Sequence, residues 1–147
     1  MKTLLRATLF GITAFMLSNA SAQNATTAAA AKEEGAVVTP TGLVYRSLKD
    51  GTGASPAASD TVKVHYRGTF PDGKEFDSSY KRGQPIEFPL SGVIKCWTEG
   101  VQRVKVGGKA KLTCPPAIAY GERGAGGVIP PNATLVFEVE LLGISGK

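Results

Sequence analysis

Short stretches in which apolar and polar residues alternate run through most of this sequence, and this period of two constrains the fold more than any other feature. In residues 62–67, Val62, Val64 and Tyr66 share one face of an extended chain, while the side chains between them are polar. Residues 134–142 repeat the pattern with a second set of apolar residues. Each stretch predicts a strand that is buried on one face only, as in an antiparallel sheet.

Turn signals separate these stretches and set their order. The 18 glycines and nine prolines exceed what a helical bundle needs. Residues 43–49 predict a strand that stops at a turn over residues 50–53, and residues 71–74 predict a tight hairpin leading into residues 75–79. Residues 97–104 form the one convincing helical stretch. We therefore predict an α+β fold, a curved antiparallel sheet wrapped around one short helix.

The N-terminal segment has the features of a secretory signal peptide. Lys2 and Arg6 flank the start of an apolar run over residues 7–17, and small residues at 20–22 provide a cleavage site. The run is shorter than the roughly 20 residues that span a bilayer. We expect residues 1–22 to be removed after Ala22, which leaves a periplasmic or secreted protein outside the membrane; an N-terminal core helix is the alternative.

The residues that follow differ in composition from the rest of the chain. Residues 23–35 are rich in Ala and Thr and have no apolar periodicity. They fit a flexible tether or a short helix, which would be marginal in isolation, and the tether is the favoured interpretation. The predicted organisation is thus a signal peptide (1–22), a tether (23–37) and one domain (38–147).

Several function classes find no support. Signal cleavage reduces the net charge from +5 to +3, and no Lys/Arg stripe indicates a nucleic-acid partner. A single histidine argues against a His-based metal centre. That residue, His65, falls on the polar face of its strand, where we expect it to be exposed. No phosphate loop, dinucleotide fingerprint, redox Cys pair or nucleophile triad is present, so no metal or cofactor is expected.

Five segments, taken together, resemble the FKBP family, the macrolide-binding peptidyl-prolyl cis-trans isomerases, and most closely its bacterial secreted branch of macrophage-infectivity-potentiator-like proteins. They occur in the family's order between about residues 38 and 144. They are Val64-His65-Tyr66-Arg67-Gly68, Phe76-Asp77-Ser78-Ser79, Gly92 through Gly100, Ala119-Tyr120-Gly121, and Ile129 through Leu142. The resemblance implies the same curved sheet around a helix, with a pocket between them.

The resemblance also assigns residues to that pocket. Trp97 corresponds to its floor, and Ile86 stands where many relatives have an aromatic residue. The remaining substrate-binding positions are the aromatic walls Tyr66, Phe76 and Phe137, the rim residue Val93, and the flap-loop residues Val128 and Ile129. The catalytic positions are Asp77, the hydroxyl of Tyr120 and the backbone N–H of Ile94.

The function implied is acceleration of X–Pro rotation during the folding of exported proteins. The partners implied are proline-containing unfolded polypeptides, with macrolides such as rapamycin as inhibitors. The alternative is a holdase-type chaperone or a proline-peptide binding module without significant isomerase activity. We expect a monomer, because the short tether cannot supply the long N-terminal helices through which related secreted proteins dimerise.

Cys96 and Cys114 form an even pair that survives signal cleavage. In an oxidising compartment such a pair favours a disulfide, and the family fold places the two segments near each other. Two buried free thiols are the alternative.

Overall fold

The structure is a computed structural model that describes residues 19–145. The charged and apolar parts of the predicted signal peptide, residues 1–18, lie outside the described residues. Within the described range, no helix is both long and apolar enough to cross a membrane.

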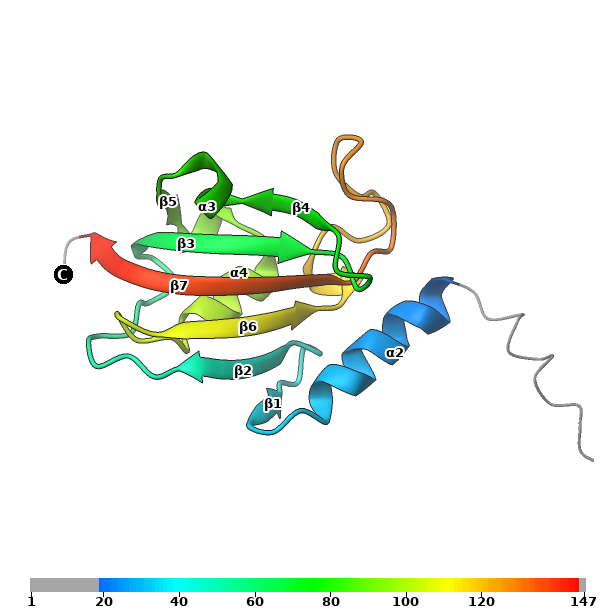
Figure 1. The fold of residues 1–147 in the computed structure, drawn as a ribbon, viewed down its shortest axis with the longest axis horizontal. Helices are drawn as coiled ribbons and strands as arrows, with labels where there is room; N and C mark the ends of the chain where they lie inside the picture. Colours follow the sequence, from blue (N-terminus) through cyan, green and yellow to red (C-terminus); the bar gives the residue numbers. More distant parts are fainter. Residues whose placement is uncertain (1–18, 146–147) are drawn as a thin grey trace, which may run out of the picture.

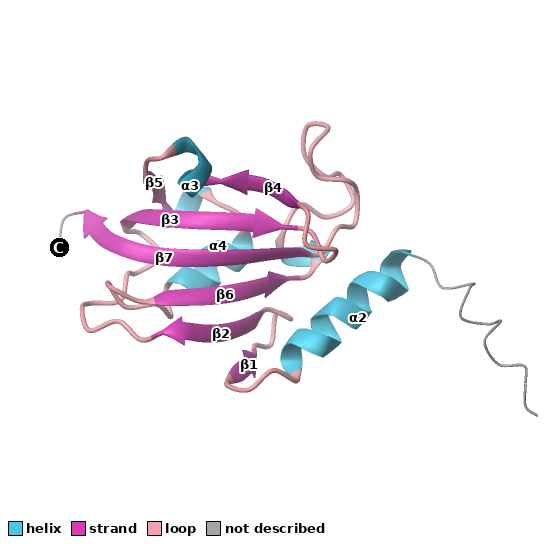
Figure 2. Ribbon diagram, viewed as in Figure 1, coloured by secondary structure: helices cyan, strands magenta, loops and turns pink. Residues whose placement is uncertain are grey.

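One antiparallel sheet of seven strands organises the molecule (Figures 1 and 2). The strand order is β1-β2-β6-β7-β3-β4, and β5 pairs with the first part of β3. The strands are β1 (Ala36–Val38), β2 (Val44–Lys49), β3 (Thr61–Thr69), β4 (Glu75–Ser78), β5 (Ile86–Pro89), β6 (Lys109–Cys114) and β7 (Leu135–Ser145). The predicted hairpin is confirmed, because the N–H of Phe70 donates to the carbonyl of Lys74 at 2.9 Å between β3 and β4.

The alternation in the sequence gives the sheet a buried and a solvated face. Along β3 the buried residues include Val62, Val64 and Tyr66, as predicted, and the strand ends on the buried pair Gly68 and Thr69. Along β7 the buried residues include Phe137 and Leu141, while the glutamates between them are partly exposed. These two central strands pair from Thr61 to Thr69, which makes β3 and β7 the centre of the core.

The last strand extends beyond the predicted residues to Ser145 and contains a β-bulge. The register between β3 and β7 shifts between Lys63 and Val64, so that Leu142 has no direct partner on β3. The bulge turns Leu142 outward, with 38% exposure, and returns Ile144 to the core. Because bulges increase local twist, this one also contributes to the curvature of the sheet.

A single short helix, α4 (Lys95–Val101), covers the concave face of the sheet and lies behind it in Figure 1. It begins two residues earlier than predicted, because the Ile94 carbonyl already accepts from the N–H groups of Trp97 and Thr98. It also ends three residues earlier than predicted, at Val101. The disulfide between Cys96 and Cys114 ties its first turn to the end of β6. The remaining short elements are α3 (Ser79–Arg82) and the 3₁₀ turns η1 (Leu90–Gly92) and η2 (Pro116–Ile118).

The preference for a flexible tether differs from what the structure shows. Residues Asn19–Ala31 form helix α2, which starts before the predicted cleavage site and packs against β1, β2 and β6. Ala30 is buried in this contact, and Glu33 just after the helix pairs with Lys111 of β6 at 3.1 Å. Docking on the sheet supplies the stabilisation that so short a helix lacks in isolation.

Candidate active site

A cavity of about 710 Å³ opens between α4 and the concave face of the sheet. All the predicted site residues line it except Val128 and Ile129. Its lining consists of Tyr66, Phe76, Asp77, Arg82, Ile86, Phe88, Gly92, Val93, Ile94, Trp97, Tyr120 and Phe137. The lining side chains come from four strands, from α3, from the start of α4 and from the loop after η2. The cavity therefore exists only once the sheet has wrapped around the helix.

Trp97 is the floor of this cavity, as the resemblance implied. Its ring is 4% exposed and meets Tyr66, Phe88 and Phe137 edge-on, with ring centroids at 5.2, 5.4 and 5.5 Å. Such edge-to-face contacts fix the orientation of each ring beyond simple burial. The buried indole N–H has no hydrogen-bond partner among residues 19–145. The floor is therefore rigid and apolar, with one unused donor.

Phe76 and Phe137 form one aromatic wall, and the small size of Gly68 lets them meet. Their rings pack edge-on with centroids 5.7 Å apart. A Cβ atom on Gly68 would lie 2.6 Å from the Phe76 ring and 2.9 Å from the Phe137 ring. A side chain at position 68 would thus displace both rings that line the cavity.

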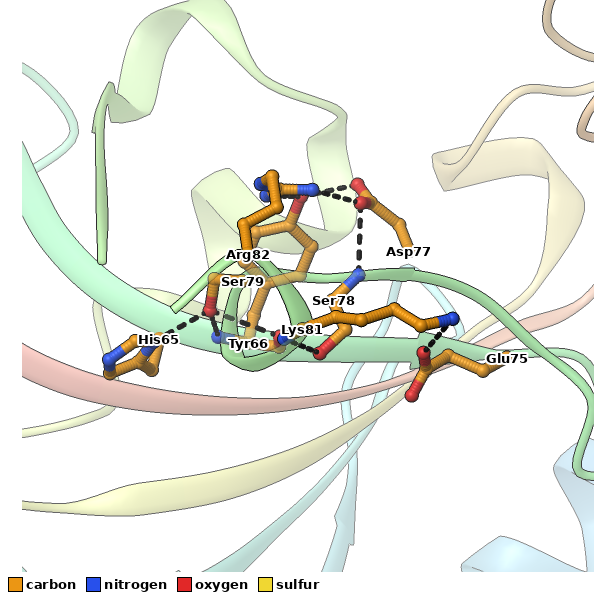
Figure 3. A network of polar contacts seen from close by, with 8 residues as sticks. All are labelled: His65, Tyr66, Glu75, Asp77, Ser78, Ser79, Lys81 and Arg82. Carbon is orange, nitrogen blue, oxygen red and sulfur yellow. Dashed lines mark hydrogen bonds and ion pairs between the residues drawn. The ribbon is translucent and has the colours of Figure 1, made fainter. Parts of the chain in front are cut away.

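A hydrogen-bonded group of three side chains forms the polar edge of the site (Figure 3). Tyr66 donates its hydroxyl proton to one carboxylate oxygen of Asp77. Arg82 donates to the other oxygen of Asp77 at 2.6 Å and to the Tyr66 hydroxyl at 3.2 Å. The backbone N–H of Ser78 adds a further bond to Asp77 at 2.9 Å. Asp77 is therefore held in place by three donors.

These contacts fix the protonation states of the group. Burial alone would raise the pKa of Asp77, but hydrogen bonds from Tyr66 and Arg82 and the charge of Arg82 hold that pKa below its usual value. Burial and the hydrogen bond with Asp77 raise the pKa of Tyr66. Hydrogen bonds with Tyr66 and Asp77 raise the pKa of Arg82. At neutral pH the group is a carboxylate between a neutral phenol and a guanidinium.

The short helix α3 brings Arg82 back over Asp77. The hydroxyl of Ser78 caps its start by accepting from the N–H of Lys81 at 3.3 Å, and Gly83 ends it in the left-handed region at φ 75°. Because the helix is a single turn, the chain reverses within it. Arg82, its last residue, therefore lies on the same side as Asp77. Figure 3 shows the guanidinium lying against both Asp77 and Tyr66.

His65, predicted to be an exposed strand residue, is instead partly covered. Its Nδ1 lies 2.8 Å from the hydroxyl of Ser79, which also accepts the backbone N–H of Tyr66 at 2.7 Å. Its ring stacks on that of Tyr80 with centroids 4.6 Å apart. The expectation failed because α3 folds over this part of β3. His65 lies on the face opposite the cavity and does not line it.

Tyr120 and Ile94 stand on the open side of the cavity. The Tyr120 side chain is 39% exposed, and no residue between 19 and 145 shares a hydrogen bond with its hydroxyl. The backbone N–H of Ile94 likewise has no acceptor in the described part of the chain. Both groups are therefore available to a ligand carbonyl.

The predicted flap loop lies beside the cavity. Val128 is 56% exposed, whereas Ile129 is buried at 6%. Both line an adjoining hollow of about 440 Å³ that shares Phe76, Asp77 and Tyr120 with the main cavity. The loop is closed on itself, since Ala125 and Ile129 exchange two backbone hydrogen bonds at 2.9 Å.

Three lining residues were not predicted. Phe88 shares one face of β5 with Ile86, and this alternation could have identified it as a wall. Arg82 had a weaker signal, a cation shortly after a Ser cap and just before a glycine. Gly92 offers no side-chain signal at all.

The chemistry that this arrangement allows is narrow. The cavity presents aromatic rings, unused N–H and O–H donors and one carboxylate that already accepts three hydrogen bonds. Among the lining residues there is no thiol or primary hydroxyl, and no metal-binding group of three side chains occurs among residues 19–145. Such a site can bind and reshape an apolar segment of a ligand.

Residues 53–142 match the family described as FKBP-type peptidyl-prolyl cis-trans isomerase. The chain belongs to this family.

Relatives of known structure and sequence support the assignment. The chain is 57% identical over 114 residues to the FKBP-type peptidyl-prolyl cis-trans isomerase FkpA of Escherichia coli, covering 78% of this chain and 42% of FkpA. The crystal structure of E. coli FkpA superposes with a TM-score of 0.83 at 52% identity, covering 86% of this chain and 59% of that one. This chain thus spans less than half of the FkpA sequence.

Two further relatives match over nearly their full length. FK506-binding protein 1 of Dictyostelium discoideum is 55% identical over 103 residues, covering 69% of this chain and 96% of the relative. The crystal structure of a peptidyl-prolyl cis-trans isomerase from Pseudomonas syringae has a TM-score of 0.80 at 36% identity. That match covers 95% of this chain and 99% of the other.

Proposed function

We propose that this protein is a peptidyl-prolyl cis-trans isomerase that acts on proline-containing segments of exported polypeptides. The observation that carries the proposal is the aromatic cavity over Trp97, which is edged by the Asp77 group and carries unused donors at Tyr120 and Ile94. Family membership supports it, because the family is named for this activity.

The reaction needs only stabilisation of a twisted amide. Rotation about an X–Pro bond has a barrier of about 18–20 kcal/mol because it breaks amide resonance. The planar amide is more polar than the twisted one, so an aromatic cavity destabilises the planar form more than the twisted form and lowers the barrier. A 10⁵-fold acceleration would require about 7 kcal/mol of such differential stabilisation. The proposed function therefore requires the site to bind the twisted transition state more tightly than the planar ground state.

The three catalytic positions have separable roles in this proposal. The Tyr120 hydroxyl and the Ile94 N–H donate to carbonyl oxygens of the substrate and hold its backbone on both sides of the rotating bond. Asp77 is a fixed negative charge at the cavity edge. Because its pKa is lowered and it accepts three hydrogen bonds as a carboxylate, Asp77 does not transfer a proton in this proposal.

The direct test is an isomerisation assay on an Ala-Leu-Pro-Phe peptide, read by NMR exchange so that no protease is needed. Tyr120→Phe removes one donor and leaves the cavity shape, and we expect kcat/KM to fall by about tenfold. A wild-type protein that binds the peptide without accelerating exchange would contradict the proposal and favour a holdase or a binding module.

We also propose that the protein is exported, that it is cleaved after Ala22 and that it is a monomer. Export follows from the signal-peptide features and agrees with a disulfide between Cys96 and Cys114. Cleavage after Ala22 would shorten α2 at its start and keep the docked end with Ala30 and Glu33. Mass spectrometry of the mature N-terminus tests the cleavage, and light scattering tests the proposed monomer.

Rapamycin inhibition is also proposed, because an apolar macrolide would occupy the same cavity. A titration of the isomerase activity with rapamycin tests it. The glycines at 126 and 127 form an open loop tip that reduces the contacts available there.

A further inference from the structure

The cavity continues beyond the flap loop as a chain of three adjoining hollows. The middle hollow, of about 440 Å³, shares Phe76, Asp77 and Tyr120 with the main cavity. The far hollow, of about 600 Å³, shares Ala125, Gly126, Val128 and Ile129 with the middle one. The flap loop thus separates the proline site from a second depression, the far hollow, and borders both.

Apolar side chains connect the two ends of this path. Val128, at 56% exposure, is the most exposed large apolar side chain of the described residues and lies between the middle and far hollows. Phe70 lines the far hollow and packs on Phe76, a wall of the main cavity, with ring centroids 4.9 Å apart. A polypeptide that leaves the cavity along this path therefore stays on apolar surface.

The far hollow also carries an excess of positive charge. Lys74 and Arg123 line it, and neither forms an ion pair with any residue between 19 and 145. The third charged group there, Asp72, accepts the backbone N–H of Lys74 at 2.8 Å and so helps to close the hairpin turn. By contrast, Arg82 at the main cavity is fully engaged by Asp77 and Tyr66. Two cations of the far hollow are free to meet a carboxylate.

We propose that the far hollow is a subsite for an acidic side chain in the polypeptide that flanks the isomerised proline. The inference rests on the proposed isomerase function and adds a sequence preference to it. Lys74 and Arg123 supply the charge complementarity, and Val128 with Phe70 supplies apolar contact for the intervening residues. The proline cavity itself, whose cation is neutralised, does not select charge.

A peptide series tests the preference. Each peptide contains Ala-Leu-Pro-Phe extended by three residues on both sides, with a single Glu, Gln or Lys placed at each flanking position in turn. We expect one flanking region to give a kcat/KM for Glu about two- to fivefold above that for Gln, the size typical of an exposed ion pair. The ratio falls toward one in about 0.5 M salt, because screening shortens the range of the interaction.

Charge-reversal variants test whether the far hollow causes the preference for Glu over Gln. Arg123→Glu changes an exposed loop side chain, and we expect it to reverse the ratio so that Lys exceeds Glu at the same position. The matched control is Lys63→Glu, which makes the same charge change on the exposed side of β3, away from all three hollows. The Glu/Gln ratio is unchanged in this control.

The possible outcomes distinguish a failure of the acidic-residue subsite from a failure of the isomerase function on which it rests. Wild-type activity on every peptide with no Glu/Gln difference at any position would overturn the far hollow as a subsite and leave the isomerase function standing. Equal shifts in Arg123→Glu and Lys63→Glu would reduce the preference to net charge and also overturn it. Absence of isomerisation with any peptide would remove the proposed function itself.

Discussion

Two tyrosine–carboxylate pairs lie on opposite faces of the same sheet and have different consequences. On the concave face the hydroxyl of Tyr66, a residue 6% exposed, donates to Asp77, which also accepts from Arg82. On the convex face Tyr80, 43% exposed, donates to Glu140 at 3.1 Å and stacks on His65. In both pairs a tyrosine hydroxyl donates to a carboxylate oxygen.

The difference lies in what surrounds each pair. Tyr66 contacts the Trp97 ring edge-on and is part of the cavity, so its hydrogen bond to Asp77 fixes a wall of the site. Tyr80 is only partly covered, by the ring of His65, and a polar pair near solvent adds little stability because water solvates both partners when they separate. Burial by an aromatic cluster, rather than the pairing itself, makes the first pair part of a functional site.

The largest expected effect concerns the cross-link that only the concave side has. Replacing Cys96 and Cys114 together by Ala should lower the free energy of unfolding by about 3 kcal/mol, because the disulfide restricts the unfolded chain between residues 18 apart. Urea unfolding measures the loss. The convex control is Lys109→Ala, which breaks the pair with Glu138 and should cost less than about 1 kcal/mol. Comparable losses in both variants would show that the disulfide adds no stability of its own.

The second prediction compares the two carboxylates. Asp77→Ala leaves the Tyr66 hydroxyl and Arg82 without their acceptor, and we expect kcat/KM to fall by about tenfold or more. Glu140→Ala should leave kcat/KM within about twofold, since Glu140 does not line the cavity. Circular dichroism checks that both variants stay folded. Equal activities of the two variants would contradict the role assigned to Asp77.

The third prediction concerns the pH dependence of stability at Tyr80. Burial and the hydrogen bond with Glu140 raise the pKa of Tyr80 to about 12. A raised pKa contributes stability that is present below the unfolded value of about 10 and is lost as pH rises toward the folded value. The difference in unfolding free energy between the wild type and Tyr80→Phe should therefore be positive at pH 8 and shrink by pH 11. A difference that grows with pH would have the wrong sign.

The smallest expected effect concerns pH, because kcat/KM should stay nearly constant around neutrality. The pKa of Asp77 is lowered, so the stability that its ionised form contributes is present above its unfolded pKa of about 3.9 and is lost only as pH falls through the folded value. The pKa of Tyr66 is raised, which keeps its proton in place at neutral pH. We expect kcat/KM to vary by less than about twofold between pH 5 and pH 8. A bell-shaped profile would instead indicate acid–base catalysis.

Local patterns predicted the strands and the hairpin well. Period-two alternation placed Val64 and Tyr66 on the inner face of β3, and the turn at residues 71–74 lies where its Pro and Gly indicated. The cavity residues follow from the resemblance, which implies Trp97 as the floor, and the structure places three aromatic rings edge-on against it. These features depend on residues close together in the sequence or on motifs with fixed spacing.

Other features depend on contacts between distant segments. The Ala-rich sequence of helix α2 has no periodicity and favours a tether, yet the helix docks on the sheet. Glu33, just after it, pairs with Lys111, 78 residues further along the chain. Arg82 was not predicted because its role requires α3 to turn back over Asp77. The bulge opposite Lys63 has no signal in the alternation and sets where Leu142 and Ile144 face.

The sequence by itself determined which side chains each strand buries, because successive residues of a strand point to opposite faces. It also determined the family, through five motifs in order. Only the tertiary structure decided that Arg82 turns back onto Asp77 and Tyr66 at the cavity edge, and that the flap loop divides the cavity from a positively charged far hollow. The physical reason is that a cavity is formed by side chains from strands and a helix far apart in sequence, whose relative positions are fixed only when the curved sheet closes over α4.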